Sequence, residues 1–148
     1  MSRDKEIGFA VRRLFNVIKR DIEASSEREG IEHIKGINGW AISYFYDNRG
    51  KDIFQRDFEE RFSIRPSTAS RMLKTMEQKG FIERVSVEND ARLKKILLTN
   101  KAIENHERII KSIEKREERL KKGISDGELE TFFNVMKKLT ANLEEKND

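Results

Sequence analysis

The chain has 148 residues, which is enough for one domain with a hydrophobic core. Charged residues make up 39% of it and hydrophobic residues 36%, a balance typical of long amphipathic helices with solvated faces. Cysteine is absent, which excludes disulfides, thiolate metal sites and cysteine redox switching. The sequence contains no membrane-length apolar run and its first residues lack the apolar core of a secretory signal, so we expect a soluble cytoplasmic protein.

The positive charge of the chain is concentrated in one segment. The net charge is +4 and the pI is near 9.3. Residues 61–95 contain nine Lys or Arg and four Asp or Glu, so the segment carries +5 and the rest of the chain sums to −1. A local basic excess of this kind favours an anionic partner such as nucleic acid.

Apolar periodicity predicts two helices in the first third of the chain. One covers residues 4–24, and an aromatic-rich helix covers 33–48. The stretch SSEREG after the first helix is predicted to be a loop with Gly30 as its breaker, and Gly50 is predicted to stop the second helix. The apolar stripe of the first helix consists of Ile7, Val11, Leu14, Phe15, Ile18 and Ile22.

The middle of the chain predicts a short helix, a longer helix and a hairpin. Asp52 and Gln55 fit a capping box that opens a short helix over residues 55–62. A helix over 65–80 follows it. Two segments with strand-forming composition, FIERVSV and RLKKILL, then flank the residues END and predict a β-hairpin.

Two further helices are predicted after the hairpin. A helical pattern runs from Thr99 to Gly123. Ser125 and Glu128 form a capping box that opens a last helix. The predicted fold class is therefore mainly α with a small β-hairpin.

The helix over 65–80 has two different faces. At 100° per residue, Ala69, Met72, Leu73 and Met76 fall on one side. The opposite side carries small hydroxyls near the N-terminus and cations further on. Its residues are Ser67, Ser70, Arg71, Lys74 and Gln78.

This second face has the properties of a helix that enters the DNA major groove. Pro66 suits the first helical position, and the short side chains after it let the helix approach bases and phosphates closely. Arg and Lys further along reach guanine or the backbone. A solvated amphipathic helix with no ligand would show the same two faces. The short helix before it and the basic hairpin after it favour a DNA-binding helix over a solvated helix with no ligand.

Residues 33–103 resemble the winged helix-turn-helix of MarR-family transcriptional regulators. QRDFEERFSIRPSTASRMLKTMEQKGFIER resembles that family's helix-turn-helix, with Gly80 ending the recognition helix. DARLKKILLT resembles its wing signature, an Asp-x-Arg before an aliphatic strand ending Leu98-Thr99. Arg65 departs from the pattern because the family usually has a small polar residue there, so we expect a weaker N-cap.

The resemblance covers nearly the whole chain and implies its organisation. A winged helix-turn-helix lobe would occupy residues 33–98. Dimerisation helices would flank it at 4–24 and 99–145, all within one domain spanning 1–148. The long apolar stripes of the flanking helices also favour a homodimer, since a monomeric bundle would leave them exposed. Two-fold symmetry then predicts a palindromic operator with half-sites about 10 bp apart.

The resemblance also implies which residues contact DNA. Asp90 would brace Arg92 by charge-assisted hydrogen bonding, and Arg92 would insert into the minor groove. A solvated pair of turn residues is the alternative interpretation. The full set is Pro66, Ser67, Thr68, Ser70, Arg71 and Lys74 on the recognition helix, and Asp90, Arg92 and Lys94 on the wing.

A small-molecule effector pocket is a further implication of the resemblance. Trp40 and Tyr44 are its candidate lining residues, although the sequence alone favours core packing for both. His33 and His106 are the only histidines, and His106 lies on the apolar face of its helix, where a core or interface histidine is usual. We predict no cofactor and no metal site, and whether these two histidines bind metal stays open.

The sequence favours one of three classes of function. We expect a sequence-specific regulator of transcription that binds double-stranded DNA as a homodimer, most often a repressor in this family. A winged-helix adaptor for other proteins would lack the cationic helix face and the wing arginine, yet this sequence has both. An enzyme is not expected, because the sequence has no Gly-rich phosphate loop, Ser/His/Asp arrangement or metal-bound water motif.

Overall fold

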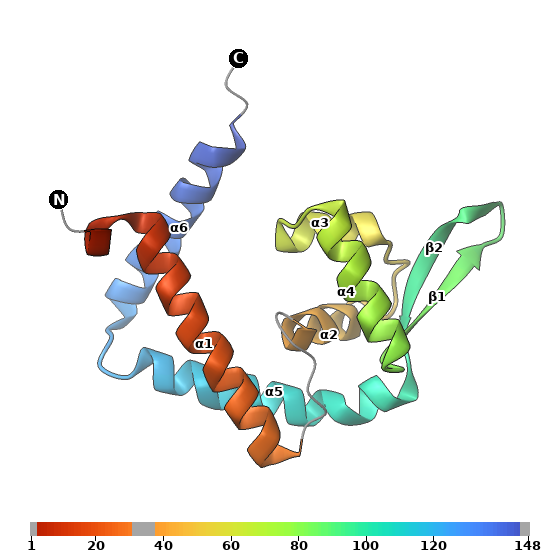
Figure 1. Cartoon of the computed structure of the whole chain (residues 1–148), viewed down its shortest axis with the longest axis horizontal. Helices are drawn as coiled ribbons and strands as arrows, with labels where there is room; N and C mark the ends of the chain where they lie inside the picture. Colours follow the sequence, from red (N-terminus) through yellow and green to blue (C-terminus); the bar gives the residue numbers. More distant parts are fainter. Residues whose placement is uncertain (1–2, 31–37, 146–148) are drawn as a thin grey trace. The chain divides into compact units, whose positions relative to one another are not determined.

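The computed structural model describes residues 3–30 and 38–145. The chain divides into two compact units, residues 1–112 and 113–148. That residues 1–148 act as one domain stays a prediction. The elements, shown in Figure 1, are η1 (Arg3–Lys5), α1 (Ile7–Glu29), α2 (Asn38–Asp47), α3 (Gln55–Phe62), α4 (Pro66–Gln78), β1 (Ile82–Val87), β2 (Asp90–Leu98), α5 (Asn100–Lys121) and α6 (Asp126–Glu144).

The fold class agrees with the prediction, since helices and one antiparallel β-hairpin make up the described residues. None of the helices described combines the length and hydrophobicity that crossing a bilayer requires.

Helix α1 is longer than predicted. The stretch SSEREG was expected to be a loop, but the helix continues through it to Glu29. Its polar composition misled the prediction, because no residue before Gly30 breaks a helix. Ser25 stays in the helix by donating its hydroxyl to the carbonyl of Asp21 at 2.7 Å. Gly30 then ends it in the left-handed region at φ 63°, as predicted.

Helix α2 ends before the glycine expected to stop it. Its last residue is Asp47, three positions ahead of Gly50. The side-chain amide of Asn48 donates to the carbonyl of Tyr44 at 2.8 Å, and the backbone N–H of Asn48 donates to the same oxygen at 3.2 Å. Asn48 thus satisfies a terminal carbonyl and closes the helix without help from glycine. The first residues of the predicted helix, 33–37, lie outside the described residues.

The predicted capping box at the start of α3 is wrong. Asp57, and not the expected pair, accepts the backbone N–H of Phe54 at 2.8 Å. Asp52 instead lies 3.7 Å from the ammonium of Lys95 on β2. Gln55 donates to the carbonyl of Pro66 at 3.3 Å, which ties α3 to the start of α4.

An aromatic cluster holds the lobe together. Phe58 of α3 is fully buried, with its ring centroid 5.5 Å from that of Phe45 and 5.2 Å from that of Phe62. These contacts link α2 to α3, so the aromatic residues of α2 help to form the core. The other fully buried large side chains are Ile42, Leu73, Met76, Phe81 and Ile82.

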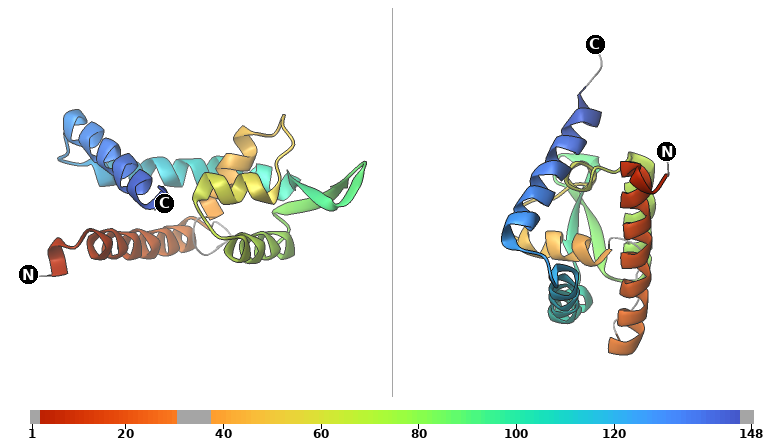
Figure 2. Two further views of the ribbon diagram at one scale, coloured as in Figure 1. Left: turned by 90° about the horizontal axis from the view of Figure 1, so that it is seen from above. Right: turned by 90° about the vertical axis from the view of Figure 1, so that its left-hand side faces the viewer.

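The hairpin is anchored to the lobe at its base. Strands β1 and β2 pair from Ile82 with Leu98 to Ser86 with Lys94, and the register then shifts before Val87. The backbone N–H of Ile96 donates to the carbonyl of Ile53 at 2.7 Å, so the segment before α3 extends the sheet at this end. Figures 1 and 2 show the rest of the hairpin projecting away from α4 as a wing.

Helix α6 begins as its sequence predicts. The hydroxyl of Ser125 accepts the backbone N–H of Glu128 at 3.2 Å, and the carboxylate of Glu128 accepts the N–H of Ser125 at 2.8 Å. This hydrogen bonding lowers the pKa of Glu128. The predicted capping box is therefore confirmed.

Candidate nucleic-acid interface

Helix α4 presents the two faces that its sequence predicts. Ala69, Leu73 and Met76 are buried and Met72 is half-buried, so the apolar side packs into the lobe. Most of the opposite face is exposed to solvent. Its exposed residues are Pro66, Ser67, Ser70, Arg71, Lys74 and Gln78, whereas Thr68 is half-buried.

Local signals fix where α4 begins and ends. Pro66 occupies the first helical position, and Arg65 before it supplies no side-chain cap, as expected for a cation there. At the other end, Gly80 has a φ of 78°. Its N–H donates to the carbonyl of Glu77 at 3.0 Å, and the N–H of Phe81 donates to that of Met76 at 2.9 Å. This is a Schellman motif, which turns the chain sharply from α4 into β1.

The turn between α3 and α4 contains a strained residue. Ser63 has a φ of 50°, the only positive φ of a non-glycine residue in the part of the chain described. The N–H of Ile64 donates to the carbonyl of Glu59 at 3.1 Å across this turn. A left-handed residue here lets the chain reverse within three residues and present α4 beside α3.

The predicted wing pair is formed through the main chain. The carboxylate of Asp90 accepts the backbone N–H of Arg92 at 2.9 Å, whereas the sequence led us to expect a bond to the guanidinium. Arg92 lies between Asp90 and Lys94, where the regular strand register is interrupted. Both Arg92 and Lys94 are exposed. Asp90 therefore fixes the backbone from which the guanidinium of Arg92 projects.

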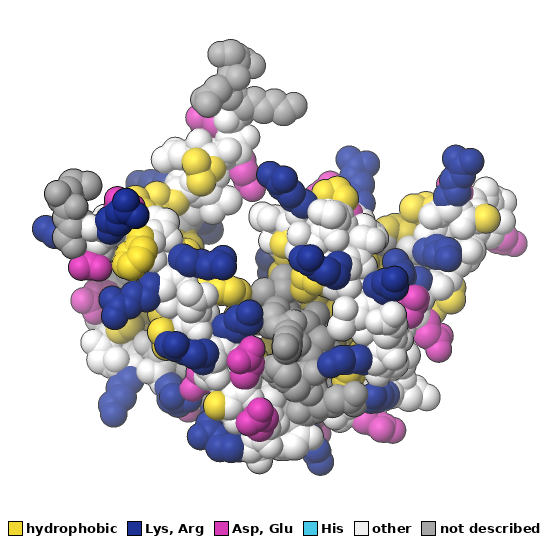
Figure 3. Space-filling model, in the orientation of Figure 1, with side chains coloured by type: hydrophobic (Ala, Val, Ile, Leu, Met, Phe, Trp, Pro, Cys, Tyr) yellow, Lys and Arg dark blue, Asp and Glu magenta, His cyan; other side chains and the backbone are white. Residues whose placement is uncertain are grey.

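Lys and Arg side chains lie over α4 and along the wing on the face shown in Figure 3. The residues Arg71, Lys74, Arg92 and Lys94 contribute cations from the two elements. A helix face and a neighbouring hairpin that both carry exposed cations match the surface that a DNA duplex requires.

An ion pair that the sequence did not predict links these two elements. Arg84 of β1 donates through Nε to one carboxylate oxygen of Glu77 at 3.2 Å and through Nη2 to the other at 3.3 Å. Hydrogen bonding to Arg84 lowers the pKa of Glu77. The two residues are seven positions apart across the Gly80 turn, so helix periodicity gives no signal for the contact.

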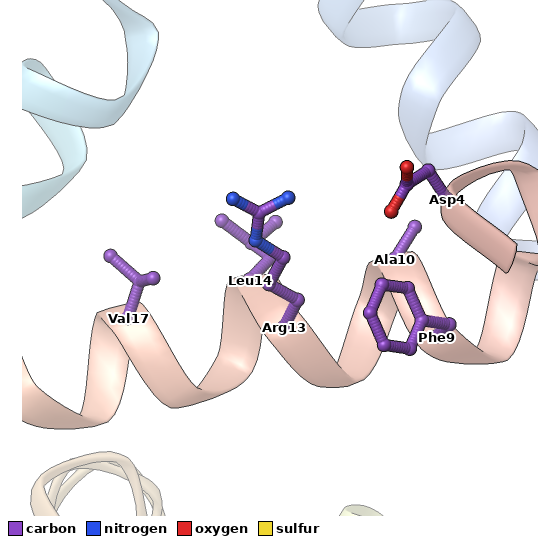
Figure 4. A pocket seen from close by; sticks show the side chains of 6 residues that line it. All are labelled: Asp4, Phe9, Ala10, Arg13, Leu14 and Val17. Carbon is purple, nitrogen blue, oxygen red and sulfur yellow. The ribbon is translucent and has the colours of Figure 1, made fainter. Parts of the chain in front are cut away.

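The candidate effector residues are part of the lobe's packing. Trp40 and Tyr44 are both half-buried. The ring of Tyr44 lies edge-on to Phe62 with centroids 5.9 Å apart, and burial raises the pKa of the Tyr44 phenol. A pocket of about 330 Å³ on η1 and α1, shown in Figure 4, includes neither residue. That Trp40 and Tyr44 line an effector site stays a prediction.

His106 of α5 stacks on an aromatic residue. Its ring centroid lies 3.5 Å from that of Tyr46, with the planes 16° apart, and the guanidinium carbon of Arg49 lies 3.3 Å from the same ring centre. Nδ1 of His106 is buried and has no hydrogen-bond partner among the described residues. Burial lowers the pKa of His106. His33 lies outside the described residues.

Metal ligands are sparse in the described part of the chain. Residues 3–30 and 38–145 contain no group of three or more His, Cys, Asp or Glu positioned to hold a metal ion. The contacts of His106 are those of a packed aromatic residue.

The helices α3 and α4 with the following hairpin define a winged helix-turn-helix fold. Residues 48–94 match the sequence profile of the MarR family. No curated protein sequence matches this chain.

Three solved structures are similar over nearly the whole chain. S. aureus MepR in complex with DNA has a TM-score of 0.81 at 22% identity, covering 93% of this chain and 98% of that one. MarR from Oenococcus oeni PSU-1 has a TM-score of 0.75 at 24% identity, covering 92% and 99%. The heme sensor PefR from Streptococcus agalactiae, in complex with heme, has a TM-score of 0.67 at 26% identity, covering 97% of each chain.

Over residues 48–94 the chain is therefore similar in sequence to the MarR family, and over nearly its whole length it has the fold of winged-helix regulators of that kind.

Proposed function

We propose that this protein is a homodimeric repressor that binds a palindromic operator in the cytoplasm and is released by a small-molecule effector. The observation that carries the proposal is the exposed cationic face of α4 beside an exposed arginine on the wing. Bound across a promoter, such a dimer blocks transcription by occupying the site.

Each side chain has a distinct role in this proposal. The first turn of α4, with Pro66, Ser67 and Ser70, approaches the major groove closely because its side chains are short. Arg71 and Lys74 reach bases or phosphates. The wing inserts Arg92 into the adjacent minor groove, where negative potential is concentrated. Thr68, Lys94 and Asp90 complete the interface, with Asp90 holding the backbone of Arg92 by the 2.9 Å bond.

The homodimer is supported by the exposed apolar residues of the flanking helices. On α1 these are 37% to 58% exposed, and on α6 they reach 89%. Side chains of this size left in water along whole helices favour burial against a second copy. They are Ile7, Phe9, Val11, Leu14, Phe15 and Val17 of α1, and Phe132, Phe133, Val135 and Leu143 of α6.

Release by an effector rests on the family alone. PefR from Streptococcus agalactiae is a heme sensor, so heme is one probe to test against the protein bound to its DNA site. An effector that binds near Trp40 and Tyr44 would act by changing the distance between the two recognition helices, because it favours the conformation that cannot bind DNA.

The proposal is tested by selecting binding sites from random duplex DNA at near-physiological salt. We expect a palindromic site, and we expect Arg92→Ala to weaken binding to it about tenfold, in line with the loss of one specific contact. The matched control is Arg108→Ala, which removes one exposed cation from α5.

The result that contradicts the proposal is weak, salt-sensitive binding with no sequence enriched. In that case an adaptor that uses the winged helix to bind another protein becomes the better interpretation. Equal losses in Arg92→Ala and Arg108→Ala would argue against a wing contact, because net charge alone would explain them.

A further inference from the structure

We propose that the Glu77–Arg84 ion pair sets the angle between the recognition helix and the wing, so that both engage one DNA site at once. This inference rests on the proposed function. Neither residue is assigned a DNA contact; they act as positioning residues through the elements that carry the contacts.

The first argument is the geometry of the pair. Both nitrogens on one side of the Arg84 guanidinium bond to the two carboxylate oxygens of Glu77, at 3.2 and 3.3 Å. Two parallel bonds fix the orientation of both side chains, whereas one bond leaves rotation free. Arg84 is the better buried partner, with 24% of its side chain exposed against 42% for Glu77.

The second argument is the unfavourable position of Glu77. It lies in the last turn of α4, where the helix dipole disfavours a negative charge. It is also on the element that is proposed to face phosphates, where a carboxylate repels DNA. Pairing with Arg84 offsets both effects, and it gives a physical reason for an acidic residue at this place.

The third argument is the position of Arg84 along the wing. The base of the hairpin is held by the Gly80 turn and by buried Phe81 and Ile82. Arg84 lies further out, paired across the hairpin with Ile96. From there to the tip, the strand is about 15 Å long at about 3.3 Å per residue. A tilt of about 10° at Arg84 would move the tip by about 3 Å, which is enough to break a hydrogen bond at the DNA.

Glu77→Ala is the decisive variant, because two explanations of the role of Glu77 predict opposite changes in DNA affinity. If the charge of Glu77 alone mattered, its removal would strengthen binding, since one repulsion with phosphate is lost. If the pair positions the wing, we expect binding to the selected site to weaken about fivefold, or about 1 kcal/mol. Alanine favours the helix, so loss of fold is not expected.

The matched control is Glu83→Ala on β1. Glu83 is an exposed acid beside Arg84 in the chain and faces the opposite side of the hairpin, so the variant removes the same charge without breaking the pair. We expect it to bind as tightly as the wild type or slightly more tightly. The double variant Glu77→Arg with Arg84→Glu restores a pair at unchanged net charge, and we expect it to recover most of the lost affinity.

The position of the wing relative to α3 can also be measured without DNA. This measurement tests the role of the ion pair independently of the proposed function. The chain has no cysteine, so Arg56→Cys on α3 and Asn89→Cys at the wing tip accept one spin label each. Labelled protein is diluted with unlabelled protein, and the distance between the two labels is measured by pulsed electron paramagnetic resonance.

We expect Glu77→Ala to broaden or shift this distance distribution and Glu83→Ala to leave it unchanged. An unchanged distribution in Glu77→Ala overturns the proposal whatever the DNA result. A shifted distribution with undiminished binding to the selected site overturns it too, because the angle would then not matter for recognition. A wild type that selects no site contradicts the proposed function, and the distances still decide whether the pair holds the wing.

Discussion

Ser63 is the residue whose backbone determines the turn of the helix-turn-helix. Its φ of 50° lies in the left-handed region, which costs a residue with a Cβ about 1 kcal/mol. The cost is offset by the hydrogen bonds that close α3 at this point, including the 3.1 Å bond from Ile64 to Glu59. The left-handed conformation of Ser63 was not predictable from the sequence, because serine is common in turns of every conformation.

We expect Ser63→Gly to raise the free energy of unfolding by about 0.5–1 kcal/mol, since glycine adopts this conformation without a steric penalty. Urea denaturation followed by circular dichroism measures the change. Ser63→Ala is the control, because it keeps the Cβ and should bring no gain. A destabilised glycine variant would mean that the serine side chain itself holds the turn.

Helices were predicted best where their ends carry local signals. Pro66 and Gly80 delimit α4, and Ser125 with Glu128 begins α6, because each acts through its own backbone within a few residues. The end of α1 was predicted too early, because polar composition is only a correlate of loops. The first residue of α3, Gln55, was predicted correctly, but its capping box was misassigned because Asp57 accepts the N–H of Phe54 in the folded chain.

The contacts between elements were not predictable from the sequence for a different reason. The Glu77–Arg84 pair forms only once the Gly80 turn has brought β1 beside α4. The stack of His106 on Tyr46 joins α5 to α2 over sixty positions, and the sequence showed only that His106 is on an apolar face. The faces of α4 were predicted correctly because a single helix determines them, whereas the bond of Asp90 to the backbone of Arg92 depends on the local course of the wing.

The stack of Arg49, Tyr46 and His106 makes the stability of the lobe depend on pH. Arg49 and His106 lie 3.3 and 3.5 Å from one ring centre, so they must occupy opposite faces of Tyr46. A proton on His106 would add a charge near Arg49 and an N–H at buried Nδ1 with no acceptor among the described residues. Asp47 opposes this by favouring the proton, but burial is the larger effect and lowers the pKa of His106.

Because the pKa of His106 is lower in the folded chain, the free energy of unfolding decreases as the pH falls. The unfolded chain, in which histidine titrates near about pH 6.5, binds the proton more readily than the folded chain does. The neutral His106 therefore makes its full contribution to the free energy of unfolding above about pH 6.5. That contribution is lost as the pH falls from there towards the lowered pKa of the folded chain. One proton limits the loss to about 1.4 kcal/mol per pH unit.

We expect His106→Phe to abolish this dependence, because phenylalanine stacks on Tyr46 and does not titrate. Urea unfolding at pH 7.5, 6.5 and 5.5 compares the variant with the wild type, and His33 contributes equally to both. Equal slopes in the two proteins would show that the stack has no role in the acid sensitivity of the lobe.

The exposed apolar faces of α1 and α6 are the features on which the proposed dimer depends. Leu14, in the N-terminal half of α1, is 47% exposed, and Phe133 of α6 is 53% exposed. Burying such side chains fully is worth about 1.5–3 kcal/mol each, so a surface of several residues supplies a strong driving force for association. The sequence predicted the stripes, but the arrangement in a dimer depends on a second copy.

We expect the wild type to be a dimer at micromolar concentration, and Leu14→Glu to shift it towards monomer because a charge would be buried without a partner. Size-exclusion chromatography with light scattering measures the mass across a dilution series. Asn16→Glu adds the same charge to the same helix outside the apolar stripe and should stay dimeric. If both variants remain dimers, α1 is not the interface. If the wild type is a monomer at every concentration, one molecule cannot bind two half-sites together. The predictions of a dimer and of a palindromic operator would then both be wrong.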